Sequence, residues 1–544
     1  MPHRNRPFSV SFVLAAFTTV VLAVPACANV LTFTQTITPN RFTSGQSSVD
    51  LISYTIESPP FDCSPPGTSL TLLNYTVTST SQQYNAFADV PFTLSFRFKD
   101  YTTSVPDNTA TVVFNGRVGG RVNQFQDSID IRLSGPPERS FLIGGTVFTL
   151  WDFQYTLPPI VGDFNSPGAI SAQMFESDAG HTDLAAAAAP VRSSPTVVDG
   201  VAYFGADDGR VYAVNAADGT AIPGFPTETA LAGNILSRAA VYIGGGTKNV
   251  YLTTDQGYVA KIGGSGQILW SVQPLGDDST SHSTPAVTPD GTVYVGITNA
   301  EGSRVVSLSD EDGRTLMPSA LLGGPGSAIS SPAVSGNRVF VGLTQGSAGD
   351  IAVLDGTTLT VLSAGVAAGE GVTAPPFVKE SDMYVGTLGQ NASGAGRFYK
   401  LNSATAAEDQ AFGLPGTPGS VEIGEPIAAS AFPNPADGTP EGVFYAGSTM
   451  GKVWRIDAQT GAHSVFYDSE DATEIAGLVI NEPGGVLAFG TTTGSFYQVP
   501  LANSSAASAF VGLGPIRTAP SFDRANNRFV VGADDNHVYS FPVQ

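Results

Sequence analysis

Apolar and polar residues alternate along the first part of the chain. Thr separates the apolar residues of the run 31–37, Thr, Ser and Arg separate Phe and Leu in the run 92–98, and Asp and Arg separate Ile and Leu in the run 129–133. A period of two, broken by Gly and Pro turns, is typical of antiparallel sheets that have one face in water. The pattern predicts an antiparallel β-sandwich domain over residues 29–175.

A different pattern, an internal repeat, begins near Ser193. Each copy has a small-hydroxyl-Pro start, an apolar strand, a turn, a second strand that ends mostly in Gly, an acidic or Gly turn, and a strand with an aromatic residue. The residues that end the second strands are Gly205, Thr253, Gly296, Gly342, Gly386, Gly447, Gly490 and Gly532. Their spacings are 48, 43, 46, 44, 61, 43 and 42 residues, and a Pro- and Gly-rich insertion around 433–442 accounts for the longest.

Each copy therefore has the signature of a four-stranded antiparallel meander. One such sheet cannot bury both of its faces, so the copies must stack. Radial stacking of twisted sheets closes into a propeller and leaves only short edges. We expect an all-β chain with an eight-bladed β-propeller over residues 191–544. An open β-solenoid and two stacked sandwiches are the alternatives.

The ends of the repeat array predict how the ring closes. The last copy stops at 537–544, after its third strand. The stretch before Ser193 is expected to supply the missing outer strand, from residues 185–189 or from residues 169–174. Residues 176–190, with charges followed by a run of Ala, have the composition of a linker.

The N-terminus has the pattern of an export signal. Arg4 and Arg6 precede the apolar run 8–24, and Ala26-Cys27-Ala28 is a small-residue cleavage site. The run is shorter than the ~20 residues that a spanning helix needs, so we expect a signal peptide at 1–28 and no membrane span. A lipoprotein box that ends at Cys27, and so a lipid anchor there, is the alternative. After cleavage at Ala28 only Cys63 remains, which excludes an intrachain disulfide.

The charge narrows the classes of partner. The formal net charge is −22, and it becomes −24 once residues 1–28 with their two Arg are removed. An acidic surface repels phosphate backbones and anionic lipids. We therefore expect no nucleic-acid partner, and a secreted, periplasmic or cell-surface location.

Two segments of the repeat resemble a known family. Ser194-Pro195 through Asn215-Ala216-Ala217-Asp218-Gly219, and residues 451–461, match the unit of the pyrroloquinoline-quinone-like (PQQ-like) repeat family. The resemblance covers residues 191–544 and implies a quinoprotein-type propeller. The family includes cofactor-dependent alcohol dehydrogenases and scaffold propellers without a cofactor. The N-terminal part is similar to sandwich modules of exported bacterial proteins, through residues 141–145 and 158–172.

The family's dehydrogenases hold PQQ with Ca²⁺ and use adjacent cysteines. This chain has no adjacent Cys pair, and of its three Trp only Trp270 falls where the family's blade-docking Trp would lie. We therefore expect no cofactor, with PQQ and Ca²⁺ as the alternative.

Acidic turns are the candidate metal ligands. Carboxylates that could bind Ca²⁺ are Asp207, Asp208, Asp310, Asp312, Asp534 and Asp535. None of these turns has the spacing of an EF-hand. Asp beside Gly or Asn is also what a tight hairpin turn requires, and turn formation is the interpretation that we favour.

The histidines do not form a hydrolytic motif. After the signal they are His181, His282, His463 and His537, with no H-x-x-x-H pair, and the chain has no G-x-S-x-G elbow. We expect His282 in a loop at one end of the channel. Paired carboxylates that converge in the channel for glycoside cleavage stay open as an alternative.

These observations lead to one hypothesis and two alternatives. We expect an exported, non-enzymatic propeller scaffold that binds a protein or glycan partner, and we name no catalytic residue. The alternatives are a PQQ- and Ca²⁺-dependent dehydrogenase and a propeller lipoprotein of envelope protein assembly.

Overall fold

The structure is a computed structural model. It describes residues 30–52, 56–62, 68–100, 109–122, 129–135, 139–143, 146–155, 168–177, 182–244, 246–345, 348–364, 371–389, 395–409, 411–413, 419–427, 432–434, 442–481 and 485–544. The expected signal peptide, Cys27 and Cys63 lie outside these ranges. No helix in the described ranges has the length and apolar character needed to cross a bilayer.

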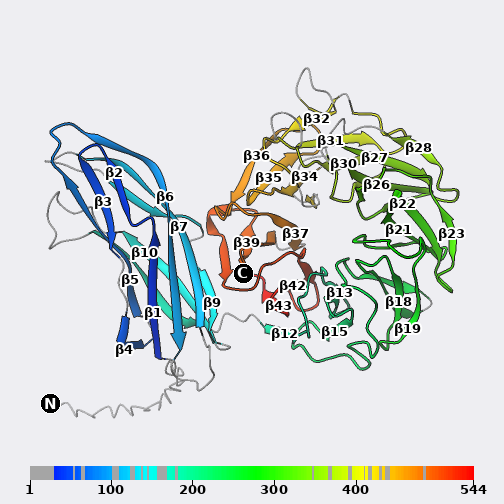
Figure 1. Ribbon diagram of the computed structural model, residues 1–544, viewed down its shortest axis with the longest axis horizontal. Coiled ribbons are helices and arrows are strands. Elements are labelled where there is room, and N and C mark those ends of the chain that lie inside the picture. Colours follow the sequence, from blue (N-terminus) through cyan, green and yellow to red (C-terminus); the bar gives the residue numbers. More distant parts are fainter. Residues whose placement is uncertain are drawn as a thin grey trace, which may run out of the picture.

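Two antiparallel sheets form the N-terminal part (Figure 1). The first runs in the order β4 (Ile56–Asp62), β1 (Val30–Thr38), β6 (Asn85–Asp100), β7 (Thr109–Val122) and β8 (Asp130–Leu133). The second begins with β2 (Arg41–Ser44), β3 (Ser47–Ile52), β5 (Thr68–Ser79), β11 (Gly168–Ser177), β10 (Thr146–Tyr155) and β9 (Arg139–Ile143).

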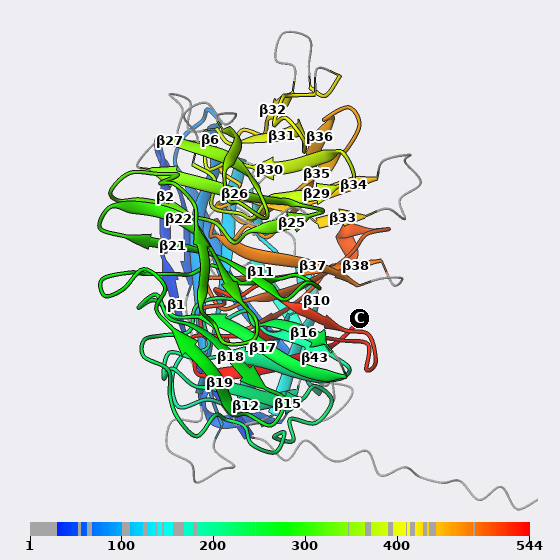
Figure 2. The ribbon, with the colours of Figure 1, turned by 90° about the vertical axis from the view of Figure 1, so that its right-hand side faces the viewer.

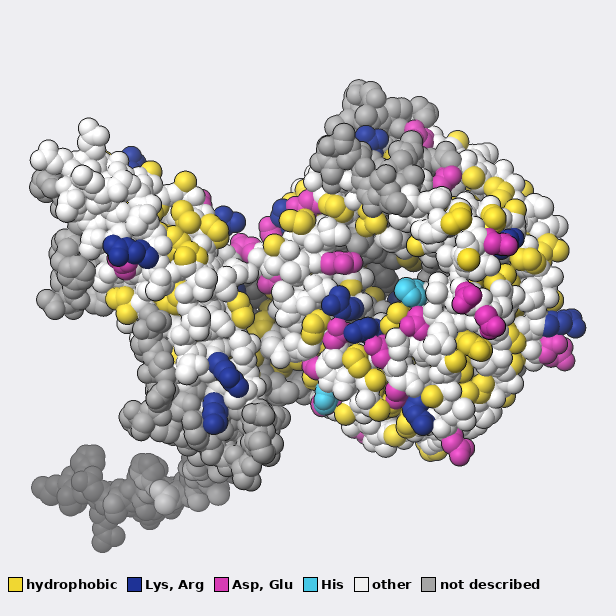
Figure 3. All heavy atoms as spheres, viewed as in Figure 1, with side chains coloured by type: hydrophobic (Ala, Val, Ile, Leu, Met, Phe, Trp, Pro, Cys, Tyr) yellow, Lys and Arg dark blue, Asp and Glu magenta, His cyan; other side chains and the backbone are white. Residues whose placement is uncertain are grey.

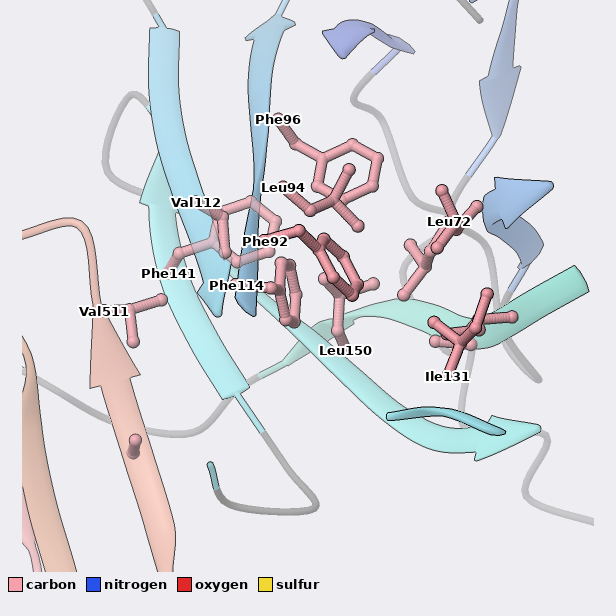
Figure 4. Close-up of a cluster of buried hydrophobic side chains, with 14 of the residues drawn as sticks. Leu72, Phe92, Leu94, Phe96, Val112, Phe114, Ile131, Phe141, Leu150 and Val511 are labelled. Carbon is pink, nitrogen blue, oxygen red and sulfur yellow. The ribbon is translucent and has the colours of Figure 1, made fainter. Parts of the chain in front are cut away.

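The alternation seen in the sequence places the apolar side chains between these sheets. Phe96 and Phe98 of β6 and Phe114 of β7 are all buried, and Figure 4 shows Phe96 and Phe114 near Phe141 and Leu150 from the second sheet. Successive side chains of a strand point to opposite faces, so the intervening Thr, Ser and Arg residues face outward. The result is one aromatic core shared by both sheets.

The rest of the chain is a ring of antiparallel sheets (Figures 1 and 2). Around it lie β13 (Thr196–Val198), β14 (Val201–Gly205), β15 (Val211–Asn215); β16 (Ala240–Gly244), β17 (Thr247–Thr253), β18 (Val259–Gly263), β19 (Ile268–Val272); β20 (Ala286–Val287), β21 (Thr292–Asn299), β22 (Gly302–Ser309), β23 (Thr315–Pro318); β24 (Ser327–Ile329), β25 (Ala333–Ser335), β26 (Arg338–Gln345), β27 (Ala348–Asp355), β28 (Val361–Ala364); β29 (Phe377–Lys379), β30 (Asp382–Gly386), β31 (Arg397–Asn402), β32 (Ser420–Glu422); β33 (Phe432–Asn434), β34 (Val443–Gly447), β35 (Lys452–Asp457), β36 (His463–Asp468); β37 (Ile475–Asn481), β38 (Val486–Thr491), β39 (Phe496–Pro500), β40 (Ser508–Val511); and β41 (Ser521–Asp523), β42 (Arg528–Gly532), β43 (His537–Pro542). The expectation of an all-β propeller is confirmed.

The repeated Gly has a packing reason. A Cβ on Gly205 would lie 2.2 Å from Ile235 Cγ2, and one on Gly342 would lie 2.3 Å from Val372 Cγ1. In both cases the β-branched residue lies in the loop just before the first strand of the next sheet, β16 or β29. At Gly532, in the last sheet, the neighbour is Val191, which lies just before the first strand of the first sheet. Each of these glycines leaves room for the adjacent sheet.

The ring closes where a strand from before the first repeat pairs with the last strand of the chain. β12 (Thr182–Ala186) pairs antiparallel with β43, with Thr182 opposite Ser540 and Ala186 opposite His537. The expectation that the stretch before Ser193 supplies the outer strand is thereby confirmed, but the strand is Thr182–Ala186 and overlaps the expected 185–189 only at its end. The segment 176–190, whose composition indicated a linker, therefore contains a paired strand. The alternative stretch, 169–174, belongs to β11 and pairs with β5 and β10. That alternative was wrong because its apolar residues are needed in the N-terminal core.

The N-terminal sheet joins the ring directly. β9 pairs parallel with β40, so the second N-terminal sheet continues through β40, β39, β38 and β37 as ten strands. Arg139 at the start of β9 is 7% exposed and donates to the carbonyls of Val113 and Ser134. Its guanidinium lies 4.4 Å from the centre of the Phe114 ring, and burial lowers its pKa.

Candidate interaction surface

The acidic residues in the turns of the first and last repeats form hydrogen bonds and ion pairs with other residues of the chain. Asp208 accepts hydrogen bonds from Tyr212 Oη at 2.6 Å and from the backbone N–H of Arg210 at 2.9 Å. Arg192 lies 3.2 Å from an oxygen of Asp207. Burial, ahead of the nearby carboxylates, raises the pKa of Asp207 despite Arg192. These contacts hold the turn after β14 against the closing sheet.

The corresponding carboxylates of the closing sheet have similar partners. Asp534 pairs with Arg192 at 3.4 Å and with Arg517 at 2.9 Å. Asp535 accepts from Tyr539 Oη at 2.9 Å and from the backbone N–H of Gly514 at 2.7 Å. The acidic turns of the two ends are thus tied together through Arg192.

Asp310 and Asp312 occupy one turn and differ in burial. Asp310 accepts from Tyr251 Oη and lies 2.7 Å from Lys261 Nζ, and its carbonyl accepts from Trp270 Nε1 at 2.9 Å. Asp312 is exposed and accepts from the backbone N–H of Arg314 at 3.2 Å. Trp270 therefore docks its sheet onto the next one through the turn that contains Asp310.

A quinoprotein cofactor finds no matching set of donors in this arrangement. Ca²⁺ needs six to eight oxygen ligands. Among the described residues no three His, Cys, Asp or Glu side chains are grouped so that they could hold a metal ion. The six acidic candidates lie in three separate turns, and each has one or more hydrogen-bonding or ionic partners in the protein. The six acidic candidates are therefore engaged in contacts within the protein and do not form one set of Ca²⁺ ligands.

The ring is open at its centre (Figure 3). Arg238, at the start of the second sheet, donates from one Nη to the carbonyls of Pro195 at 3.4 Å and Pro520 at 3.2 Å. These prolines belong to the first and last repeats, so Arg238 bridges the two ends of the ring. Burial lowers the pKa of Arg238. His282, which the sequence placed in a loop, is exposed.

The outer strands of the ring differ in what covers them. β40 is paired by β9, whereas β19 ends its sheet without a further described strand and packs on the next sheet through the buried Trp270. β23 and β28 are the outer strands of two neighbouring sheets, and the described residues contribute no further strand beyond either of them. All four residues of β23 are exposed, as are three of the four in β28. Figure 3 shows hydrophobic side chains over this part of the ring, on the side opposite the N-terminal sheets.

The exposed side chains of these two strands are uncharged and, apart from Thr315, apolar. β23 has Leu316 at 46% exposure and Met317 at 39%, and β28 has Val361 at 41% and Leu362 at 49%. Leu321, shortly after β23, is 46% exposed. Exposed edge strands of soluble proteins normally carry charged residues or Pro, which prevent other strands from pairing with them; β23 ends in Pro318, whereas β28 has neither a charge nor Pro. We define the β23–β28 surface by these five apolar residues.

A groove of about 590 Å³ lies beside β28, between its sheet and the next. Leu362 and Phe340 line it from one sheet, and Glu380 and Ser403 line it from the other. Two of its polar side chains have partners in the protein: Asn337 Nδ2 donates to Asp355 at 3.0 Å, and Arg338 donates to the carbonyl of Ser403 at 3.3 Å. Leu362 is the exposed apolar side chain of this groove.

A second cleft, of about 640 Å³, lies between β6 and β7 and the propeller turns before β35 and after β36. Asn115 donates to the carbonyl of Glu470 at 3.3 Å across it. Burial and then Asp468 raise the pKa of Glu470, although Arg117 opposes this shift. This cleft separates the two parts on one side of the β9–β40 junction. Neither cleft was found by sequence reasoning, because each is formed by segments far apart along the chain.

Comparison with models of known protein families shows to which family the chain belongs. The family model described as "Outer membrane protein assembly factor BamB" matches residues 255–541, more than half of the chain. The chain belongs to this family. The resemblance to PQQ-like repeat propellers is thereby confirmed. No curated protein matches the chain significantly.

Solved structures with the BamB-type ring resemble the chain in fold. BamB from Moraxella catarrhalis is 16% identical, with a TM-score of 0.46, and the match covers 67% of this chain and 100% of that one. Quinohemoprotein alcohol dehydrogenase from Comamonas testosteroni is 14% identical, with a TM-score of 0.49, and the match covers 67% and 76%.

Proposed function

We propose that this protein is an exported propeller scaffold that binds another protein. One observation carries the proposal: β23 and β28 expose an uncharged apolar surface on the side of the ring opposite the N-terminal sheets. A soluble protein rarely leaves such a surface without a partner. The family description, an assembly factor for outer membrane proteins, supports a role in protein–protein contact.

The proposal includes a location and an organisation. We propose that residues 1–28 direct export to the periplasm or the cell exterior, in keeping with a family described by its outer-membrane role. We also propose a β-sandwich over 29–175 and an eight-bladed propeller over 191–544. The net charge of −22 favours a neutral or basic protein as the partner rather than a nucleic acid.

Site-specific photocrosslinking in the native host tests the scaffold function. A photoreactive amino acid at Leu316 should give a discrete protein adduct that mass spectrometry identifies in repeated experiments. The same amino acid at Tyr84, an exposed residue of the N-terminal part, is the matched control. Equal adduct patterns from both positions, or no adduct from Leu316, would refute the proposal.

An assay for oxidation tests the alternative function. Purified protein supplied with PQQ and Ca²⁺ should give no dye-linked oxidation of alcohols or sugars above background. Activity above background would favour the dehydrogenase alternative. A glycan array tests the glycan partner separately, and we expect no binding there that depends on the β23–β28 surface.

A further inference from the structure

We infer that β28 is a strand-addition site, at which the partner adds an extended segment with alternating apolar residues to the edge of the sheet. This inference rests on the proposed scaffold function and specifies its partner. The segment pairs through its backbone with β28 and places one apolar side chain in the groove beside Leu362. The partner protein is neutral or basic.

The edge of β28 is suited to pairing. β28 is the last strand of its sheet, and among the described residues no strand pairs with its outer side. Its sequence, Val-Leu-Ser-Ala, contains neither a charge nor Pro. By contrast, β32 and β36, the outer strands of the next two sheets, contain Glu422 and Asp468. Unpaired backbone N–H and C=O groups on an uncharged edge bind an added strand through main-chain hydrogen bonds.

The chain itself shows this mode of binding. The outer strand β40 is paired by β9, a strand from a different part of the molecule, with Ala509, Phe510 and Val511 opposite Arg139, Ser140 and Phe141. The outer edge of a propeller sheet in this protein therefore accepts a strand from outside the ring. β28 holds the same position in its own sheet as β40 does in its sheet.

The groove gives the site its specificity. Leu362 is 49% exposed and lines the groove of about 590 Å³, in which Asn337 and Arg338 already have partners in the protein. An aliphatic side chain from the added strand would cover Leu362 without burying an unpaired Asn337 or Arg338 side chain. Ser363 Oγ donates to the carbonyl of Thr405 at 2.9 Å in the next sheet, which holds β28 in place beside the groove.

Charge selects the partner over a second copy of the chain. Asp355 and Glu380 outnumber the one cation among the described residues of the groove, Arg338, and the whole chain has a net charge of −22. Two copies would therefore repel each other, whereas a neutral or basic segment would not. Lys or Arg residues that flank the apolar positions of the added segment would face these carboxylates.

A defined peptide tests the inference. The probe is fluorescein-labelled Lys-Val-Thr-Val-Lys-Val-Thr-Val-Lys, and its twin has N-methyl groups on alternate amides, which removes pairing along one edge. We expect saturable binding of the probe to the full chain by fluorescence anisotropy, and none of the twin. Leu362→Lys should weaken binding about tenfold or more. Leu269→Lys, a matched change at a residue of β19 that is 48% exposed, should leave it unchanged.

Hydrogen exchange and oligomeric state complete the test. Bound probe should slow amide exchange in the peptide that contains β28, and the free protein should stay monomeric by light scattering. Equal binding of the N-methylated twin, equal loss in Leu269→Lys, or a dimer that Leu362→Lys dissolves would overturn the inference. If Leu316 still crosslinks a partner while Leu362→Lys binds the probe normally, the scaffold function stands and only strand addition at β28 fails.

Discussion

At the residue scale, carboxylates in turns act mainly as internal acceptors. Asp310 illustrates this role, because it binds Tyr251 and Lys261 from one sheet while its carbonyl binds Trp270. Lys261 is only 8% exposed, and the carboxylate of Asp310 lies 2.7 Å from its ammonium group. The same turn contains Asp312, which is exposed and makes only local contacts.

Asp310→Ala should lower the free energy of unfolding by about 2–4 kcal/mol, because it leaves the buried ammonium of Lys261 without its carboxylate. Asp312→Ala should change it by less than about 0.5 kcal/mol. Urea denaturation of both variants measures the difference. Added Ca²⁺ should not raise the stability of the wild type, and a rise that Asp310→Ala or Asp312→Ala abolishes would instead support metal binding in this turn.

Gly532 tests the contact between neighbouring sheets at the point where the ring closes. A Cβ there would lie 2.6 Å from Val191 Cγ1, so Gly532→Ala should cost about 1–3 kcal/mol by overpacking. Val191→Ala in the same chain should restore part of that loss, since it removes the colliding methyl groups. A double-mutant cycle by chemical denaturation measures the coupling, and strictly additive effects would contradict the contact.

At the scale of elements, the closing strand β12 has a titratable link to β43. His537 Nδ1 lies 2.7 Å from Asp183, and this hydrogen bond raises the pKa of His537 above its ordinary value of 6.5. A raised pKa means that the folded state binds the proton more tightly than the unfolded chain does. The link therefore stabilises closure fully at pH values below 6.5 and is lost as the pH rises through the folded pKa.

Thermal unfolding from pH 5.5 to 8.5 should show this loss. Both side chains are about one-third or more exposed, so the effect should stay below about 1 kcal/mol. Asp183→Asn should flatten the part of the pH dependence that comes from His537, whereas His282→Gln should leave it unchanged. An unchanged slope in Asp183→Asn would show that the pair contributes nothing to closure.

At the scale of the whole molecule, the N-terminal sheets and the propeller share one core. Leu487, Phe489 and Tyr497 of the propeller are buried in the same cluster as Phe96 and Phe141 of the N-terminal part. The β9–β40 pairing also joins the second N-terminal sheet and one propeller sheet into a continuous ten-stranded sheet, so the two parts are linked by both backbone pairing and apolar packing.

A chain that begins at residue 178 should therefore be less stable than the full protein, and it should associate. Removal of the N-terminal sheets bares the edge of β40 and the apolar residues packed beside it, which invites pairing between copies. Differential scanning calorimetry and light scattering measure both effects. A monomeric propeller with the melting temperature of the full chain would show that the two parts are independent.

The candidate site could be predicted only in part. The acidic turns were visible in the sequence, because Asp beside Gly or Asn is a local signal, but their partners Arg192, Lys261 and Tyr539 could not be assigned from it. The apolar residues of β23 and β28 have the same composition as buried strands. Only their position on the outside of the ring distinguishes them from core.

The sequence by itself determined the all-β class and the repeat, because strand alternation and turn chemistry are local properties. It also determined that a strand from before Ser193 closes the ring, since the last repeat lacks one. The tertiary structure alone decided which segment closes it, that β9 extends the sheet of β40, and which outer edges are free. Those features depend on pairing between segments hundreds of residues apart, and no local pattern in the chain encodes the choice of partner.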